Sequence, residues 1–404
     1  MMVPDDISLY VHIPFCRSRC DYCDFFTRTG VSVERQRLIV RRILEQARRV
    51  LTHYSSPPVR TVYIGGGTPA SLPPELLSEL LFGLYRLPGT DHVEEWTIEC
   101  NPEQITPEFV AFIGDTPVDR LSIGIQSFDP EVLRILGRRV DARTGLRAME
   151  LIARTDKNRA LRWSGDLITA VPGQTDEMVF ADISRMVSFG PAHLSVYELG
   201  IEHDTRLGLQ SRRGRIQEVD DDRALAQLRI VRSVCEEHGL ARYEVSNFAR
   251  AGAESLHNLR YWEMRPYAGV GPGAVGTLPG DKTPAIRIST GRDFQRYLTN
   301  PDFAEEREEL SPKTLAAEFF LMGLRTGRGV DCGRFQSVFG IRPEALISGT
   351  IARNRSFFAD PDGSGTIPAG IRLTEAGIDI TDRIVGEIFD ELDSHGFGTG
   401  AEYR

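Results

Sequence analysis

The first half of the chain alternates short apolar runs, rich in β-branched residues, with longer amphipathic segments. Segments such as ELLSELLFGLYRL place apolar residues at i, i+3 and i+4, the spacing of a helix that covers a sheet. Repeated strand–helix units of this kind build parallel sheets, because each helix carries the chain back to start the next strand in the same direction. The runs predict strands at 9–13, 59–64, 96–100, 120–125, 162–169 and 193–199.

The number of these units decides between the α/β architectures. About six units over roughly 200 residues favour a partial (βα)6 barrel of the TIM type, because a closed barrel needs eight strands and about 250 residues. An open doubly wound sheet is the structural alternative. Both belong to the α/β class.

Beyond these units the pattern changes twice. The segment 239–300 is rich in glycine, proline and aromatic residues and predicts a loop-rich connector with one strand at 243–246. From about residue 311 helical patterns return, separated by turns such as DPDGSGTIPAG. We expect a core at 1–238, the connector at 239–300 and a smaller C-terminal α+β domain at 301–404, for which a winged helix is one candidate form.

Charge and hydropathy exclude several classes of protein. The 404 residues include 48 lysines and arginines against 57 aspartates and glutamates, a formal net charge of −9 at pH 7. We expect no nucleic-acid binding, because nonspecific binding depends on lysine and arginine side chains that neutralise phosphates, and this chain carries a net negative charge. No apolar run approaches the ~18 residues that span a bilayer, and MMVPDDISLY lacks the regions of a secretory signal. The sequence predicts a cytoplasmic protein without stable membrane insertion.

Three of the six cysteines, Cys16, Cys20 and Cys23, form a C-x3-C-x2-C motif directly after the first predicted strand. Crowded thiols in a reducing compartment indicate metal or redox chemistry. A [4Fe–4S] cluster takes four ligands, so three cysteines leave one iron open. A structural zinc ion is the alternative and could use His12 as its fourth ligand. Position 25 holds Phe25 and not a further cysteine.

Polar or glycine-rich residues mark the ends of several other predicted strands. The strand at 59–64 leads into a GGGTP turn, and the polar residues near the ends of later strands are Glu99, Gln126 and Asp166. Because the carboxyl ends of parallel strands meet at one face of a barrel, we expect these residues to gather with the thiols there. A glycine run alone marks many turns, so the joint pattern carries this prediction.

Longer motifs extend this pattern from about residue 9 to residue 276: YVHIPFCRSRCDYCDF, YIGGGTPASL, TIECNP, RLSIGIQSF, LGRR, DLITAVPGQT, HLSVYEL, YEVSNFA, HNLRYW and GPGA. Their order resembles the radical S-adenosylmethionine (SAM) superfamily. More narrowly, it resembles the group of oxygen-independent coproporphyrinogen III oxidases and heme chaperones, with a C-terminal domain like that of the oxidases. Three features favour the heme-chaperone branch: Phe25 replaces a further cysteine, only fifteen residues precede Cys16, and HNLRYW resembles the HNxxYW motif of that branch.

The resemblance implies cofactors and the residues that hold them. Cys16, Cys20 and Cys23 would hold three irons of a [4Fe–4S] cluster, and SAM would chelate the fourth. His257 would be the residue to test as a heme ligand. The residues that would line the SAM site are Tyr10, Tyr22, Gly66, Gly67, Thr68, Glu99, Gln126, Arg138 and Asp166.

The resemblance also implies a function: binding of heme and its transfer to an acceptor protein, with an electron donor for the cluster. The alternative is oxygen-independent coproporphyrinogen III oxidase, which decarboxylates propionate side chains with SAM. Because both share the cluster and SAM, enzyme activity stays open, as does formation of a homodimer. The HNxxYW motif could instead only fix the connector against the barrel by packing.

Overall fold

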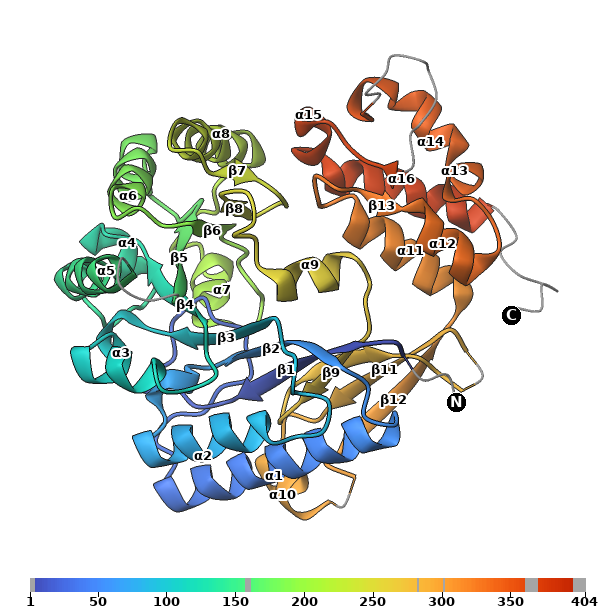
Figure 1. Cartoon of the computed structure of the whole chain (residues 1–404). Helices are drawn as coiled ribbons and strands as arrows, with labels where there is room; N and C mark the ends of the chain where they lie inside the picture. The colour runs from blue at the N-terminus through green and yellow to red at the C-terminus, as the bar shows by residue number, and fades with distance from the viewer. Residues whose placement is uncertain (1–3, 157–160, 282, 301, 360–369, 395–404) are drawn as a thin grey trace.

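A twelve-stranded sheet organises the larger part of the molecule (Figure 1). The computed structural model describes residues 4–156, 161–281, 283–300, 302–359 and 370–394. Six parallel strands stand in chain order at the centre of the sheet, each within two residues of its predicted bounds. They are β1 (Ile7–Ile13), β2 (Val59–Gly66), β3 (Glu95–Cys100), β4 (Arg120–Gln126), β5 (Arg162–Thr169) and β6 (His193–Glu198).

These six strands do not close into a full barrel. On its outer side β1 pairs in parallel with β9 (Tyr267–Val270), while β6 pairs antiparallel with β8 (Asn247–Ala249). Because the strand order rises without the reversal of a doubly wound sheet, the partial (βα)6 barrel is confirmed and the open doubly wound alternative is wrong. The remaining strands of the sheet are β7 (Ala241–Arg242), β10 (Val275–Leu278), β11 (Ala285–Thr290) and β12 (Glu305–Leu310).

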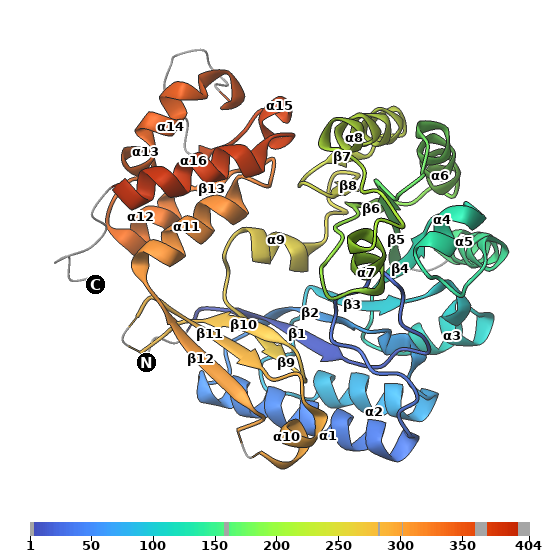
Figure 2. The same cartoon turned by 180° about the vertical axis from the view of Figure 1, so that it is seen from behind.

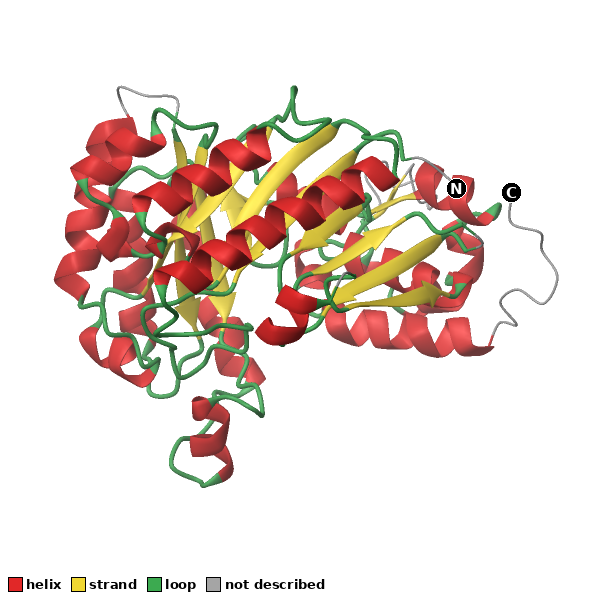
Figure 3. Cartoon of the chain, turned by 90° about the horizontal axis from the view of Figure 1, so that it is seen from below, coloured by secondary structure: helices red, strands yellow, loops and turns green. Residues whose placement is uncertain are grey.

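Helices lie across the outer face of the parallel strands (Figure 3). In α2, Leu76, Leu80 and Leu84 repeat every four residues and are fully buried, which is the apolar stripe that attaches a helix to a sheet. Within the described residues, no helix combines the length and apolar character that crossing a bilayer requires. The helices between β1 and β7 are α1 (Val33–His53), α2 (Pro74–Tyr85), α3 (Pro107–Ile113), α4 (Pro130–Ile135), α5 (Ala142–Asp156), α6 (Asp176–Ser188), α7 (Arg206–Arg212) and α8 (Asp221–Glu237).

The connector differs from the predicted loop-rich segment. The strand predicted at 243–246 is wrong: Tyr243 N–H donates to the carbonyl of Asn247 at 3.1 Å, so this segment is the turn between β7 and β8. Further along, β9, β10 and β11 continue the sheet. Glycine lets the backbones of two strands approach closely there, since a Cβ on Gly269 would lie 2.1 Å from the carbonyl oxygen of Val275 on β10. The two helices of the connector are α9 (Leu256–Trp262) and α10 (Phe294–Thr299).

A smaller unit of helices follows the sheet, and α9 lies between the two (Figure 2). It has its own core, in which Phe319, Phe320, Phe335 and Phe339 stack with ring centroids 4.5 to 5.6 Å apart. The predicted turn at 360–369 lies outside the described residues. The elements of the unit are α11 (Pro312–Gly323), β13 (Val330–Asp331), α12 (Cys332–Phe339), α13 (Pro343–Leu346), α14 (Ser348–Arg353), β14 (Gly370–Ile371), α15 (Glu375–Ile378) and α16 (Thr381–Ser394).

Asp182 on α6 makes the stability of the barrel depend on pH. Its buried carboxylate accepts hydrogen bonds from the Ser127 hydroxyl at 2.5 Å and from Phe128 N–H at 2.8 Å. Burial outweighs both bonds and raises the pKa of Asp182 from its ordinary 3.8 to about 6. Because the pKa is higher in the folded state than in the unfolded state, the stability that this group contributes is full below pH ~4 and is lost as the pH rises through ~6.

We therefore expect Asp182→Asn to flatten this pH dependence. Between about pH 4 and pH 7, the unfolding free energy of the variant should fall by about 3 kcal/mol less than that of the unaltered protein, at roughly 1.4 kcal/mol per pKa unit. Urea denaturation at several pH values measures this difference. Equal pH dependence of the two proteins would contradict the assignment.

Candidate functional site

A pocket of about 370 Å³ opens at the carboxyl ends of the parallel strands. The loop that follows β1 supplies three thiols to it, from Cys16, Cys20 and Cys23. This loop is closed at its base, where Arg28 N–H donates to the carbonyl of Pro14 at 2.7 Å and Cys16 N–H donates to the carbonyl of Arg28 at 3.1 Å. The fold therefore brings the three predicted cysteines into one cavity.

The thiols have polar neighbours within the pocket. Cys16 Sγ lies 3.7 Å from Thr68 Oγ1, and Arg138 Nη1 donates to Cys20 Sγ at 3.6 Å. Burial raises the pKa of Cys16 to about 11 and also raises the pKa of Cys23. Across the described residues, no three histidine, cysteine, aspartate or glutamate side chains are arranged so that they could hold a metal ion together. A metal would therefore have to draw these thiols together and displace their protons.

His12 and Tyr10 are not among the residues that line this pocket. His12 is buried, its Nε2 bonds to the carbonyl of Phe26 at 2.9 Å, and its Nδ1 bonds to the Tyr10 hydroxyl at 3.0 Å. With both ring nitrogens engaged, His12 has none left to bind a metal, so the zinc alternative lacks its proposed fourth ligand. The Tyr10 ring packs against His12 and Tyr63, and its predicted place in the SAM site stays a prediction.

The glycine turn after β2 forms one wall of the pocket. Gly66 has a φ of +106°, and a Cβ there would lie 2.6 Å from the His12 ring, so only glycine suits the position. Its N–H donates to Glu99 Oε2 at 3.0 Å, while the N–H groups of Gly67 and Thr68 donate at 2.8 Å to carbonyls of β1 and the loop after it. Because all three N–H groups are used, backbone contacts to a ligand here would have to come from carbonyl oxygens.

Two half-buried carboxylates face the same space. Glu99 accepts a hydrogen bond from the Tyr63 hydroxyl at 2.9 Å, and Asp166 accepts one from the Ser122 hydroxyl at 2.6 Å. Burial raises the pKa of Glu99 to about 7 and that of Asp166 to about 6. Neither carboxylate has an ion-pair partner within the described residues. The pocket therefore suits a ligand that carries positive charge.

Arg138 supplies the opposite charge. Its Nη2 donates to the carbonyl of Gly124 at 2.6 Å and to Asn101 Oδ1 at 3.1 Å. Asn101 also donates to Thr68 Oγ1 at 3.1 Å; sequence reasoning did not single it out, although it lies in the TIECNP motif directly after β3. Gln126, with a φ of +67°, ends β4 in a strained conformation of the kind found at ligand sites. The predicted residues Tyr22, Gln126 and Arg138 all line the pocket.

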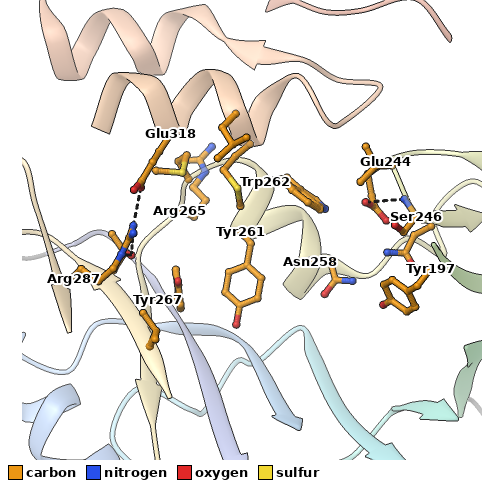
Figure 4. Close-up of a pocket in the computed structure, with 17 residues that line it drawn as sticks. Tyr197, Glu244, Ser246, Asn258, Tyr261, Trp262, Arg265, Tyr267, Arg287 and Glu318 are labelled. Atoms are coloured by element: carbon orange, nitrogen blue, oxygen red, sulfur yellow. Dashed lines mark hydrogen bonds and ion pairs between the residues drawn. The ribbon is translucent and has the colours of Figure 1, made fainter. Parts of the chain in front are cut away.

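A second cavity, of about 580 Å³, lies between α9, the strands β9 to β11 and α11 (Figure 4). Three residues of the HNxxYW motif line it: Asn258, Tyr261 and Trp262. Tyr197 at the end of β6 lines both cavities, so the two adjoin. The other lining residues are Glu244, Val245, Ser246, Asn247, Met264, Arg265, Tyr267, Val275, Thr277, Arg287, Glu318, Leu321 and Met322.

His257, the first residue of the motif, lies outside this lining. Its side chain is fully buried, its Nδ1 bonds to Thr61 Oγ1 at 2.8 Å, and its Nε2 bonds to the Tyr261 hydroxyl at 2.7 Å. Burial lowers the pKa of His257 to about 3, so the ring is neutral at physiological pH. Coordination of heme iron by His257 would have to break one of these bonds, and that assignment stays a prediction.

Comparison with known proteins places this arrangement in a family. Residues 10–185 match the model of the radical SAM superfamily. The heme chaperone HemW of Lactococcus lactis is 32% identical over 343 residues, which are 84% of this chain and 86% of the relative. The heme chaperone HemW of Mycobacterium tuberculosis (strain H37Rv) is 36% identical over 353 residues, 84% of this chain and 87% of the relative. The chain belongs to the HemW family of radical SAM proteins.

The fold of this HemW-family chain is also found in a solved structure. Coproporphyrinogen III oxidase (HemN) from Escherichia coli aligns with 97% of this chain and 91% of its own, with a TM-score of 0.77 and 18% sequence identity. Likeness at that identity concerns the fold alone. Because the alignment covers nearly the whole chain, it includes the C-terminal helical unit as well as the partial barrel.

Membership of the HemW family and of the radical SAM superfamily implies a [4Fe–4S] cluster and SAM. The chemistry of the first pocket fits both groups. The loop after β1 supplies three thiols, while the fourth thiol of the pocket, Cys100, donates to the carbonyl of Ser122, so a cluster on the loop would keep one iron open. Two carboxylates without ion-pair partners among the described residues, together with Arg138, complement the positive and negative charges of SAM. When bound, such a cluster supplies single electrons for the cleavage of SAM, and the protein supplies orientation and exclusion of water.

Proposed function

We propose that this protein holds a [4Fe–4S] cluster and SAM in the first pocket, binds heme in the second cavity and transfers the heme to an acceptor protein. The observation that carries the proposal is the adjacency of the two cavities, which share Tyr197. One cavity has the thiols and charges for the cluster and SAM. The other is larger and has aromatic walls.

In the first pocket, Cys16, Cys20 and Cys23 bind three irons and leave the fourth for SAM. An electron donor outside this chain reduces the cluster. Asn101 joins the proposed SAM site, because it connects Arg138 to Thr68. The sequence-predicted residues that line the pocket, and that we propose to contact SAM, are Tyr22, Gly66, Gly67, Thr68, Glu99, Gln126, Arg138 and Asp166.

In the second cavity, the chemistry of the walls matches that of heme. Aromatic rings such as Tyr261 and Trp262 offer flat apolar surface to a porphyrin, and the volume is in the range of small-molecule sites. Arg265 and Arg287 also line the cavity and bring positive charge toward the propionate carboxylates, with Arg287 already paired to Glu318 at 2.7 Å. The proposal is supported by the names of the relatives, since the proteins of L. lactis and M. tuberculosis are heme chaperones.

The three predicted segments take different parts in this proposal. The core, 1–238, carries the first pocket, and the connector, 239–300, carries α9 with its HNxxYW motif. The C-terminal segment, 301–404, contributes Glu318 and the neighbouring lining residues of α11 to the heme cavity. The C-terminal segment also shares the sheet with the connector, because β12 pairs with β11.

Titration with ferric heme tests the proposal. We expect a saturable Soret band at about one heme per chain, whether or not the cluster is present, because the two sites use different residues. Absence of saturable binding would contradict the proposal. Anaerobic incubation with reductant, SAM and coproporphyrinogen III tests the alternative, since formation of protoporphyrinogen would make the protein an oxidase.

A further inference from the structure

Among its described lining residues, the second cavity offers heme iron neither histidine nor cysteine. Heme iron in proteins is held by histidine, cysteine, methionine or tyrosine. The remaining candidates are Tyr197, Tyr261, Tyr267, Met264 and Met322. Their contacts distinguish them.

A chain of hydrogen bonds shows where the proton of the Tyr261 hydroxyl points. Arg260 Nε–H donates to Ser8 Oγ, and the Thr61 hydroxyl donates to the same oxygen at 2.9 Å. Because the hydroxyl hydrogen of Thr61 is used on Ser8, Thr61 Oγ1 accepts the Nδ1–H of His257 at 2.8 Å. His257 Nε2 is then the unprotonated nitrogen, and it accepts the hydroxyl hydrogen of Tyr261 at 2.7 Å.

This arrangement separates Tyr261 from the other tyrosines of the cavity. Tyr261 projects from α9 into the middle of the lining residues (Figure 4), and its hydrogen bond to His257 Nε2 fixes the orientation of its oxygen. Among the described residues, neither Tyr197 nor Tyr267 has a hydrogen bond to a histidine, although the Tyr267 ring centroid lies only 4.5 Å from that of Tyr261. Tyr261 is therefore the tyrosine of the cavity whose oxygen is held in place by a buried histidine.

We propose that Tyr261 binds the iron of ferric heme and that His257 is a positioning residue that orients the Tyr261 oxygen. This inference rests on the proposed function. On binding, an Fe–O bond forms, the O–H bond of Tyr261 breaks, and its proton is released to the solvent. The water bound to the free ferric heme leaves, and the iron keeps its oxidation state. His257, fully buried and outside the cavity lining, acts through Tyr261.

Two probes separate ligation from packing: ferric heme and iron-free protoporphyrin IX. We expect Tyr261→Phe to weaken ferric heme binding at least ~10-fold, the scale of a lost metal-site contact, and to leave binding of the iron-free porphyrin unchanged. Tyr85→Phe is the control, because Tyr85 is exposed on α2 and lines neither cavity; it should leave binding of both probes unchanged. Resonance Raman spectra of the unaltered protein should show iron–tyrosinate bands, and Tyr261→Phe should remove them.

His257→Gln tests the positioning role, because glutamine can still accept a hydrogen bond. We expect it to keep the tyrosinate bands while weakening ferric heme binding ~10-fold. A nitrogen-ligated spectrum that is lost in His257→Gln and kept in Tyr261→Phe would overturn the inference and leave the proposed function standing. If the unaltered protein binds neither probe, the proposed function fails, and the inference fails with it.

Discussion

Cys20→Ala is expected to abolish the iron–sulfur cluster. Only three cysteines line the first pocket on the loop after β1, and a cluster bound there already has one iron without a cysteine ligand. Two thiolates cannot hold it, so the variant should lose its iron, its acid-labile sulfide and its visible absorbance. Iron and sulfide analysis after anaerobic reconstitution measures the loss.

Cys100→Ala is the matched control for this experiment. Cys100 lines the same pocket from the end of β3, but its buried thiol donates to the carbonyl of Ser122 at 3.5 Å. We expect this variant to keep a full complement of iron. Retention of the cluster in Cys20→Ala, or its loss only in Cys100→Ala, would show that the ligand set is wrong.

Glu95→Ala is expected to destabilise the protein by about 3–5 kcal/mol, the cost of leaving buried charge without its partner. Glu95, fully buried at the start of β3, accepts hydrogen bonds from the first N–H groups of α9, including that of His257 at 3.0 Å. It also lies 3.5 Å from the guanidinium groups of Arg120 and Arg162. Its removal takes these acceptors from the helix start and leaves the buried Arg120 with the Ala253 carbonyl but without its carboxylate partner.

The neighbouring residue provides the control. Glu94 pairs with Arg60 at 2.6 Å, but both side chains are about half exposed, and such pairs contribute at most ~1 kcal/mol. We expect Glu94→Ala to leave the denaturation midpoint nearly unchanged. Glu95→Ala should lower this midpoint strongly and, because Glu95 holds α9 in place, should also weaken heme binding. Equal effects of the two substitutions would contradict the role given to Glu95.

Local patterns predicted much of the fold. In the parallel strands an apolar residue recurs at every second position, as Leu9, Val11 and Ile13 do in β1, and the side chains of a strand point alternately to its two faces. The three thiols and the polar residues near the strand ends, including Glu99 and Asp166, were also found from spacing. These predictions succeed because strand direction alone brings the carboxyl ends of parallel strands to one face.

Contacts between distant segments could not be predicted in this way. The sequence alone did not show whether His257 lines a cavity or supports a residue that does. In the structure its ring bonds to Thr61 and lies outside the cavity lining. Glycine in the connector indicated loops, whereas Gly269 lies in a strand because its backbone approaches that of Val275.

The sequence by itself determined the class of the fold, the order of its strands and the thiols that meet at the barrel mouth, because the hydrophobic effect and strand direction act along the chain. Only the tertiary structure decided the second cavity, which α9, three strands and α11 form together. It also decided the direction of the Tyr261 hydroxyl, which is set by Ser8, Thr61 and His257. Hydrogen bonds are short and directional, so they depend on positions that the folded chain alone defines.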